Sequence, residues 1–267
     1  MPGRLMIIFY TLIFSTFIIC SCSEYQRILK GSDYDKKLEK AKEYYDKKDY
    51  ARALSLLEEL LSIFKGTSKA EEVYFLYSYC HYHQDNYILA GYYFQDFSRT
   101  FPNSKHCEEA EFMGAYCYYL DSPDFSLDQE NTVKAIQELQ LFINRHPESG
   151  RLKEANDLID QLRYKLETKA LYNSKLYYDM GDYKAAIISF KNALKDFPDT
   201  RYREEIMFLM LDASYLLATN SVTEKRIERF QVTIDNFHAF RNEFPSSKMM
   251  NKAEKIYSES KYQITVN

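Results

Sequence analysis

Tryptophan is absent from this chain of 267 residues, and glycine and proline are scarce, with 7 and 6 residues. An all-β fold needs many tight turns, which glycine and proline usually supply, so their scarcity argues against such a fold. The 35 basic and 39 acidic residues nearly balance, and no tract rich in Lys and Arg occurs. The chain therefore lacks the basic footprint that is typical of nucleic-acid-binding proteins.

Motifs of catalysis are missing as well. The sequence contains no glycine-rich phosphate loop, no GxSxG turn and no HExxH pair. On a helix, the run Cys80–His83 would place Cys80 and His83 on one face, but no third ligand follows on the next turns, so we expect no metal site there. We predict a protein that is not an enzyme and that holds no metal and no cofactor.

The N-terminal part of the chain, 1–22, forms a separate region. Arg4 is followed by an uncharged, mostly apolar stretch at 5–19, which has the length of a signal peptide and is too short to span a membrane comfortably. Residues 19–22 read Ile-Cys-Ser-Cys and resemble the bacterial lipobox. We therefore predict that residues 1–21 are removed and that Cys22 carries a covalent lipid. An ordinary secretory signal or an uncleaved anchor is the alternative.

A proline motif recurs along the rest of the chain. An aromatic residue or histidine, a proline and then a Ser or Thr follow one another at 101–104, 146–149, 197–200 and 244–247, and a copy without proline occupies 64–67. Proline ends a helix, and Ser or Thr can cap the next one. The motif returns every 37 to 51 residues, which is typical of an array of helical repeats.

A second pattern precedes each of these stops at a constant distance, and it begins at Tyr50, Tyr87, Thr132, Tyr183 and Phe230. A small residue follows three positions later, and mostly large apolar residues follow at offsets of seven and ten. Such offsets form one stripe of a helix. Another helical stretch precedes each start, so the sequence predicts five units of helix A, turn, helix B and stop.

This unit resembles the tetratricopeptide repeat, which has Tyr, Ala, Phe and Pro at this spacing. The resemblance predicts an all-α fold, an α-α superhelix (solenoid) of about five tetratricopeptide-like helix pairs. Insertions at Leu120–Asn131 and Thr219–Arg226 would loosen the third and fifth units. We expect Arg151–Tyr178 to form one unusually long helix A.

Two other features recur with the repeat. Glutamate pairs at 71–72, 108–109 and 204–205 come early in a helix A, where the helix dipole favours negative charge, so we interpret them as structural rather than catalytic. Cys80 and Cys117 occupy equivalent positions of successive units, where a small buried side chain is expected. A disulfide between them is the alternative, since an exported protein permits one.

The 25 tyrosines and 18 phenylalanines suggest a binding surface, because an aromatic ring with a polar tip suits one. In tetratricopeptide arrays the A helices line the concave groove. That resemblance places Phe75, Tyr79 and Tyr82 of the second unit in a peptide groove, with Lys42 and Tyr45 at the matching positions of the first. For any single tyrosine, packing between repeats is an equally good explanation.

The complete arrangement, a lipidated Cys22 closely followed by five such repeats, resembles the BamD family of outer-membrane lipoproteins. Residues 22–30 (CSEYQRILK) look like the N-terminal segment of that family. The resemblance implies a lipid-anchored protein on the periplasmic face of the cell outer membrane, within the machinery that assembles β-barrel proteins. The implied partners are the C-terminal segments of unfolded outer-membrane proteins and the periplasmic domain of a BamA-type β-barrel subunit.

We accordingly divide the chain into four parts. They are a signal peptide (1–21), an anchored segment (22–32), repeats 1–3 with the substrate groove (33–148), and repeats 4–5 with a final helix for partner docking (149–267). One alternative function is that of another tetratricopeptide scaffold lipoprotein of the cell envelope. A SusD-like glycan-binding lipoprotein is less favoured, because that family is about twice as long and the missing tryptophan argues against a sugar platform.

Overall fold

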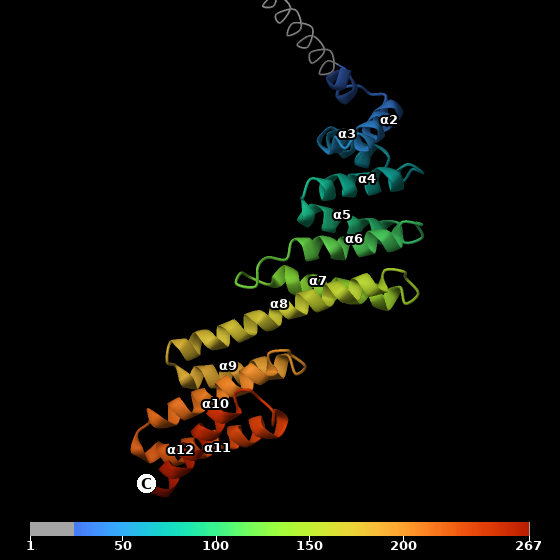
Figure 1. Ribbon diagram of the computed structural model, residues 1–267. Coiled ribbons are helices and arrows are strands. Elements are labelled where there is room, and N and C mark those ends of the chain that lie inside the picture. Colours follow the sequence, from blue (N-terminus) through green and yellow to red (C-terminus); the bar gives the residue numbers. More distant parts are fainter. Residues whose placement is uncertain (1–23, 267) are drawn as a thin grey trace, which may run out of the picture. The chain divides into compact units, whose positions relative to one another are not determined.

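The computed structural model describes residues 24–266, and within this range all regular structure is helical (Figure 1). Residues 24–29 form a short first helix. The helices that follow are α2 (Tyr34–Asp46), α3 (Tyr50–Ile63), α4 (Ala70–His83), α5 (Tyr87–Thr100), α6 (Cys107–Leu120), α7 (Glu130–Arg145), α8 (Leu152–Asp179), α9 (Tyr183–Asp196), α10 (Arg203–Thr219), α11 (Thr223–Glu243) and α12 (Met250–Val266).

The predicted all-α class and the repeated helix pair are confirmed. Tyr50, Tyr87 and Tyr183 each begin a helix B, and α8 is a single helix of 28 residues, as expected. The insertion predicted at Thr219–Arg226 is wrong for the most part. Helix α11 already begins at Thr223, because the guanidinium of Arg226 donates to the carbonyl oxygens of Ser221 and Thr219 and so stabilises a short connection.

The stripe predicted for helix B forms the core. The residues at offsets of three, seven and ten from each predicted start are all buried: Ala53, Leu57, Leu60, Ala90, Phe94, Phe97, Ala135, Leu139, Phe142, Ala186, Phe190, Ala193, Thr233, Phe237 and Phe240. Cys80 and Cys117 are buried and free, so the disulfide alternative is wrong. Burial raises the pKa of each of these two thiols to about 12, which keeps both protonated and unreactive.

The chain divides into two compact parts, which we call unit 1 and unit 2 and which are distinct from the single helix-pair repeats. In the described residues, unit 1 comprises 24–122 and 130–156, and unit 2 comprises 123–129 and 157–266. The α6–α7 loop joins unit 2 because the ring of Phe125 lies 4.9 Å from that of Tyr172 and the ammonium of Lys169 donates to the carbonyl of Leu127. The division falls inside α8, whereas the boundary predicted from the sequence lies at 148/149.

The hydroxyl residue of each proline motif caps a turn rather than helix A itself. Its oxygen accepts from the backbone N–H two residues later, at distances of 2.9 to 3.3 Å, in all five copies: Thr67, Ser104, Ser149, Thr200 and Ser247. Helix A then begins three residues after the hydroxyl residue, for example at Ala70. The motif thus satisfies the backbone of the connection before the helix starts.

The same hydroxyl also links each stop to helix A of its own repeat. Ser104, Ser149 and Thr200 donate to the carboxylates of Glu71, Glu108 and Glu167 at 2.7, 2.6 and 2.9 Å. Each of these glutamates lies 33 or 41 residues before its partner, on the previous A helix. Glu71 and Glu108, the first glutamates of the pairs at 71–72 and 108–109, therefore make structural contacts. This agrees with the interpretation from the sequence.

Candidate functional site

Cys22 lies outside the described residues, but the segment that follows it is fixed to the first repeat. Ile28 is buried, and the ring of Tyr25 meets that of Tyr44 edge-on at 5.8 Å. The side chain of Lys37 is almost fully buried; its ammonium donates to the carbonyl of Leu29 at 2.9 Å and forms an ion pair with Glu59. A lipid on Cys22 would thus be next in sequence to a segment that is packed on repeat one.

Aromatic rings gather along the A helices of unit 1. We define the ring ladder as Tyr45, Phe75, Tyr79, Tyr82, His83 and His106. Tyr79 lies at its centre, with its ring centroid 5.0 Å from that of Phe75, 6.2 Å from that of Tyr82 and 5.9 Å from that of His83. Edge-on and offset arrangements at these distances are the favourable ones for aromatic pairs.

Two imidazoles extend the ladder at its ends. The His106 ring stacks on Phe75 at 4.4 Å, and the His83 ring stacks on Tyr50 at 4.3 Å while meeting Tyr45 edge-on at 5.9 Å. The structure therefore brings together four of the candidates from the sequence: Tyr45, Phe75, Tyr79 and Tyr82. It adds His83 and His106, which were not predicted to lie in the groove.

Lys42, the fifth candidate, pairs with an acid instead of a ring. Its ammonium forms an ion pair with Glu72 of the next A helix. The Tyr79 hydroxyl, at the equivalent position one repeat later, donates to Glu109 in the same way. The second glutamate of each of these pairs thus links successive A helices, which again favours a structural role for the pairs.

The ladder is partly open to solvent. Tyr45, Phe75, Tyr79 and Tyr82 are half-buried, and His83 is exposed. The Tyr79 ring also packs on the fully buried Phe94 at 4.9 Å. The rings therefore contribute to packing between repeats and still present a surface, so both explanations weighed from the sequence apply to the same side chains. Peptide binding by these residues stays a prediction.

The ladder carries little charge at neutral pH. Burial raises the pKa of Tyr79 well above its usual value, and the hydrogen bond to Glu109 adds to the effect, so the phenol stays protonated. Burial likewise raises the pKa values of Tyr45 and Tyr82. For His83, desolvation by the rings packed on it and the nearby Lys48 lower the pKa, which favours the neutral imidazole. The surface suits apolar and aromatic groups with hydrogen-bonding edges.

One signal in the sequence pointed to His83: it lies four residues after Tyr79, on the same helical face. No such signal exists for His106, since it precedes α6 and meets Phe75 only through the packing of α4 on the next repeat. In the described part of the chain, no group of three His, Cys, Asp or Glu side chains is placed to hold a metal ion. None of the described helices is long and apolar enough to cross a membrane.

Comparisons with known proteins show the family of this chain. The family model described as YfiO, outer membrane lipoprotein, matches residues 32–229. No curated protein sequence matches the chain. Among solved structures, the TPR2AB domain of yeast Sti1 in complex with pHSP90 is similar at 12% identity, covering 86% of this chain and 99% of that chain with a TM-score of 0.39. A likeness at that level carries no argument about function.

Proposed function

The chain belongs to the YfiO family of outer-membrane lipoproteins, and from this membership we propose that it is a non-enzymatic subunit of the machinery that assembles β-barrel proteins in the outer membrane. The YfiO family is BamD-like, so the resemblance drawn from the sequence is confirmed at the level of the family. In the proposed role, the protein captures unfolded polypeptide and docks another subunit. Binding, rather than bond chemistry, is its contribution.

The ring ladder of unit 1 is the observation that carries this proposal. Its half-buried rings form a continuous, nearly neutral surface on α2 and α4. The C-terminal segment of an unfolded outer-membrane protein, which ends in an aromatic residue, would stack on such rings and bury apolar area. The ladder therefore offers a capture surface on the repeats of unit 1.

The proposed location follows from Cys22 and the segment behind it. A triacylated cysteine buries several acyl chains at about 0.8 kcal/mol per methylene, which gives stable attachment to a membrane. Residues 24–29 pack on the first repeat through Tyr25 and Ile28. The lipid would therefore hold the ring ladder close to the periplasmic face of the outer membrane.

Unit 2 would dock the periplasmic domain of a BamA-type subunit. Tyr172 and Leu176 of α8 are 57% and 58% exposed, and Met180, which directly follows the last residue of α8, is 71% exposed. The spacing of four residues places Tyr172 and Leu176 on one face of the helix, and Met180 continues from its C-terminal end. A contiguous exposed apolar stripe is typical of an interaction surface, and this stripe is the feature of unit 2 that supports the second interface.

A peptide titration tests the capture surface. A synthetic peptide with the C-terminal sequence of an outer-membrane β-barrel protein is titrated into the wild type and into Phe75→Ala and Tyr79→Ala. We expect each variant to lose about tenfold in affinity, or roughly 1.4 kcal/mol. Tyr172→Ala in unit 2 is the matched control and should bind as the wild type does. Unchanged affinity in both ladder variants would reject the assignment.

Purification of the intact lipoprotein in mild detergent tests the proposed complex. We expect a large β-barrel protein to co-purify in a stoichiometric amount. If no barrel subunit is present, the chain would instead be a different scaffold lipoprotein of the envelope. Cys22→Ala should move the chain from the membrane fraction to the periplasm once the barrel subunit is depleted; a variant that still sediments with membranes would contradict the lipid anchor.

A further inference from the structure

Three rings of α6 repeat the pattern of the ring ladder one repeat later. Phe112, Tyr116 and Tyr119 follow the phenylalanine and the two tyrosines that α4 gives to the ladder by 37 residues. Phe112 and Tyr116 stack with ring centroids 5.9 Å apart, and Tyr116 stacks on Tyr119 at 5.6 Å. Phe112 is almost fully buried, whereas the two tyrosines are half-buried. A peptide that lies on the ladder can therefore continue onto rings of the same kind on α6.

An arginine packs on the first of these rings. The guanidinium carbon of Arg151 lies 4.5 Å from the centroid of the Phe112 ring. His106 holds the equivalent position one repeat earlier, two residues after the hydroxyl residue of the stop, and its ring stacks on Phe75 at 4.4 Å. Both backbone N–H groups donate to that hydroxyl, at 2.9 Å for His106 and 3.1 Å for Arg151. The repeat thus fixes the backbone at this position, and Arg151 brings a permanent positive charge to it.

The charge of Arg151 acts on the ladder. Burial and the hydrogen bond to Glu109 raise the pKa of Tyr79, and the positive charge of Arg151 opposes this rise. The guanidinium therefore lies within electrostatic range of the central ring of the ladder. A peptide that occupies the ladder and the α6 rings would pass close to this cation.

The guanidinium of Arg151 has N–H groups to spare. Its ion pair is with Glu154, whose Oε2 lies 3.6 Å from the Arg151 Nη1, which is longer than a hydrogen bond. The two side chains are 41% and 53% exposed, and exposed pairs of this kind contribute little stability. Within the described part of the chain, the guanidinium donates no hydrogen bond. Because one face packs on Phe112, the planar edge is left to take both oxygens of a carboxylate.

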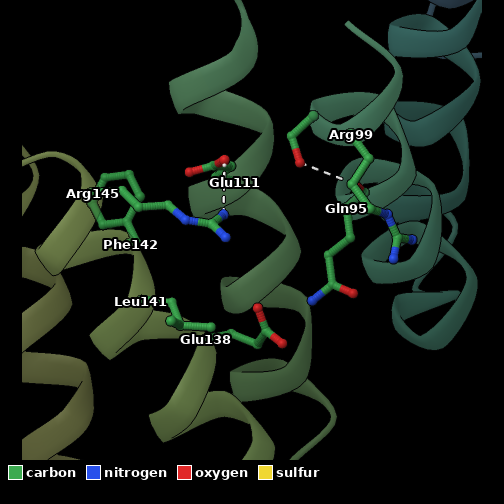
Figure 2. A pocket seen from close by; sticks show the side chains of 8 residues that line it. Gln95, Arg99, Glu111, Glu138, Leu141, Phe142 and Arg145 are labelled. Atoms are coloured by element: carbon green, nitrogen blue, oxygen red, sulfur yellow. Dashed lines mark hydrogen bonds and ion pairs between the residues drawn. The ribbon is translucent and has the colours of Figure 1, made fainter. Parts of the chain in front are cut away.

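Three other cations of unit 1 are paired or lie away from the rings. Lys42 forms an ion pair with Glu72. Arg99 and Arg145 line a hollow of about 200 Å³ between α5, α6 and α7 (Figure 2), where the Arg145 guanidinium lies 3.1 Å from the Glu111 carboxylate. This hollow shares no lining residue with the ring ladder or with the three α6 rings. Neither of its arginines is therefore placed to meet a peptide on the ladder.

Lys48 lies at the opposite end of the ladder. It is exposed on the turn between α2 and α3, and its charge, after the larger effect of desolvation, lowers the pKa of His83. An ammonium on a long exposed side chain is strongly hydrated and offers no planar pair of donors to a carboxylate. Arg151 is therefore the better site for an anion, and Lys48 is the competing site that a test must include.

Two acids oppose an anion near Arg151. Glu109 accepts from the Tyr79 hydroxyl and lies 3.7 Å from the His106 Nδ1, so its charge is already used within the ladder. Glu154 is the direct competitor, because it pairs with Arg151 itself. A bound carboxylate must take the place of Glu154, whose exposed side chain can turn to solvent.

We infer that Arg151 binds the C-terminal carboxylate of the captured peptide and thereby sets the direction of the peptide along unit 1. The inference rests on the proposed function, since the peptide is the aromatic-ended one that the ring ladder captures. The carboxylate occupies the edge of the guanidinium in place of Glu154, and the terminal aromatic ring lies against the α6 rings. The preceding residues follow the ladder from α4 toward α2.

The test uses the full-length chain in mild detergent and two peptides of the same aromatic-ended sequence, one with a free C-terminal carboxylate and one with a C-terminal amide. Calorimetric titration of the wild type should show about tenfold tighter binding of the free acid, since hydrogen bonds to charged groups are the strong ones. Arg151→Gln should bind both peptides equally, with the affinity that the wild type has for the amide. Unchanged binding of the amide shows that this variant keeps its fold and its ladder.

Three further variants make the test specific. Glu154→Gln should bind the free acid about threefold more tightly than the wild type does, because a competing exposed charge is gone, and should bind the amide unchanged. Lys48→Gln and Arg99→Gln, the matched controls, should keep the tenfold preference for the free acid.

Three results would overturn the inference while leaving the capture surface intact. They are equal affinity of the wild type for the two peptides, a preference for the free acid that persists in Arg151→Gln, and a preference that disappears in Lys48→Gln. If neither peptide binds the wild type, the proposed function fails and this inference fails with it.

Discussion

Units 1 and 2 use the same repeat positions for different chemistry. Eight residues before helix B lie Lys42 and Tyr79 in unit 1 and Lys175 in unit 2. Each contacts a glutamate of the next A helix: Glu72, Glu109 and Glu205.

Five residues before helix B lie Tyr45 and Tyr82 in unit 1 and Tyr178 in unit 2. The unit 1 tyrosines join the ladder, whereas the Tyr178 hydroxyl donates to Asp212.

The contact with glutamate is thus a property of the repeat, and the ring ladder is a property of unit 1 alone. Five residues before helix B, the tyrosine of unit 2 donates to Asp212 and meets Tyr183 edge-on, whereas the tyrosines of unit 1 at this position belong to the ladder. Because the fold does not require the ladder, its presence in unit 1 favours a role in binding.

The largest expected effect comes from the buried phenylalanine at offset seven of helix B. Phe94 in unit 1 and Phe190 in unit 2 are both fully buried. Replacement by Ala removes a large core side chain and leaves a cavity, so each variant should lose about 3–5 kcal/mol of unfolding free energy for its unit. Denaturant titration followed by circular dichroism measures the loss.

A second measurement on the same two variants separates the effect of the ladder from that of general stability. Phe94 supports the rings of Tyr79 and Phe75, with centroids at 4.9 and 6.3 Å, and Phe190 supports no ladder. At a temperature where both variants are folded, only Phe94→Ala should weaken binding of the aromatic-ended peptide. Equal weakening by Phe190→Ala would mean that binding reports general stability and not the ladder.

An exchange of residues between the units should have the next largest effect. Tyr79→Lys can keep a contact with Glu109, as Lys175 does with Glu205 at 3.0 Å, but it removes the central ring of the ladder. Peptide affinity should fall about tenfold, or roughly 1.4 kcal/mol. Lys175→Tyr is the reverse exchange and should leave peptide affinity unchanged. A similar loss in both variants, measured by calorimetric titration, would contradict the division of roles.

The helix ends and the core stripe were predictable because they depend on local chemistry. Proline stops, the stripe at offsets of three, seven and ten, and the starts at Tyr50, Tyr87 and Tyr183 all follow from rules that act within about one helix. The contacts between helices were not. Ser104 meets Glu71 within one repeat, and Phe75 meets His106 from one repeat to the next, and no spacing in the sequence identifies such partners.

A smaller and equal effect is expected from the hydroxyl that links each stop to helix A of its repeat. Ser104→Ala in unit 1 removes the hydrogen bond to Glu71 and the acceptor for the His106 N–H. Thr200→Val in unit 2 removes the hydrogen bond to Glu167 and the acceptor for the Tyr202 N–H. Each loss should cost about 1 kcal/mol of unfolding free energy, somewhat more where the carboxylate is left without another partner. Thermal unfolding of the two variants measures this. A much larger loss in one unit would show that the contact is not a general property of the repeat.

The smallest expected effect is a pH dependence confined to unit 1. His81 is buried against Tyr77 and Tyr93, with ring centroids at 4.7 and 5.4 Å, and its two ring nitrogens have no hydrogen-bond partner among the described residues. Burial lowers the pKa of His81, and Glu58 opposes that shift only partly. In unit 2 the equivalent position, six residues before helix B, holds Tyr177.

The direction of this pH dependence follows from which state, folded or unfolded, binds more protons. An unfolded histidine has a pKa of about 6.5, whereas folded His81 takes up its proton only at lower pH. The unfolded state therefore binds more protons below about pH 6.5, so the contribution of His81 is fully present above that pH and is lost as the pH falls through the lowered pKa. His81→Phe retains a ring that can stack on Tyr93 and removes the titrating group. In urea unfolding at pH 7.5 and pH 5.5, the variant should lose less stability between the two pH values than the wild type does. An equal loss in both would mean that other groups of unit 1 cause its pH dependence.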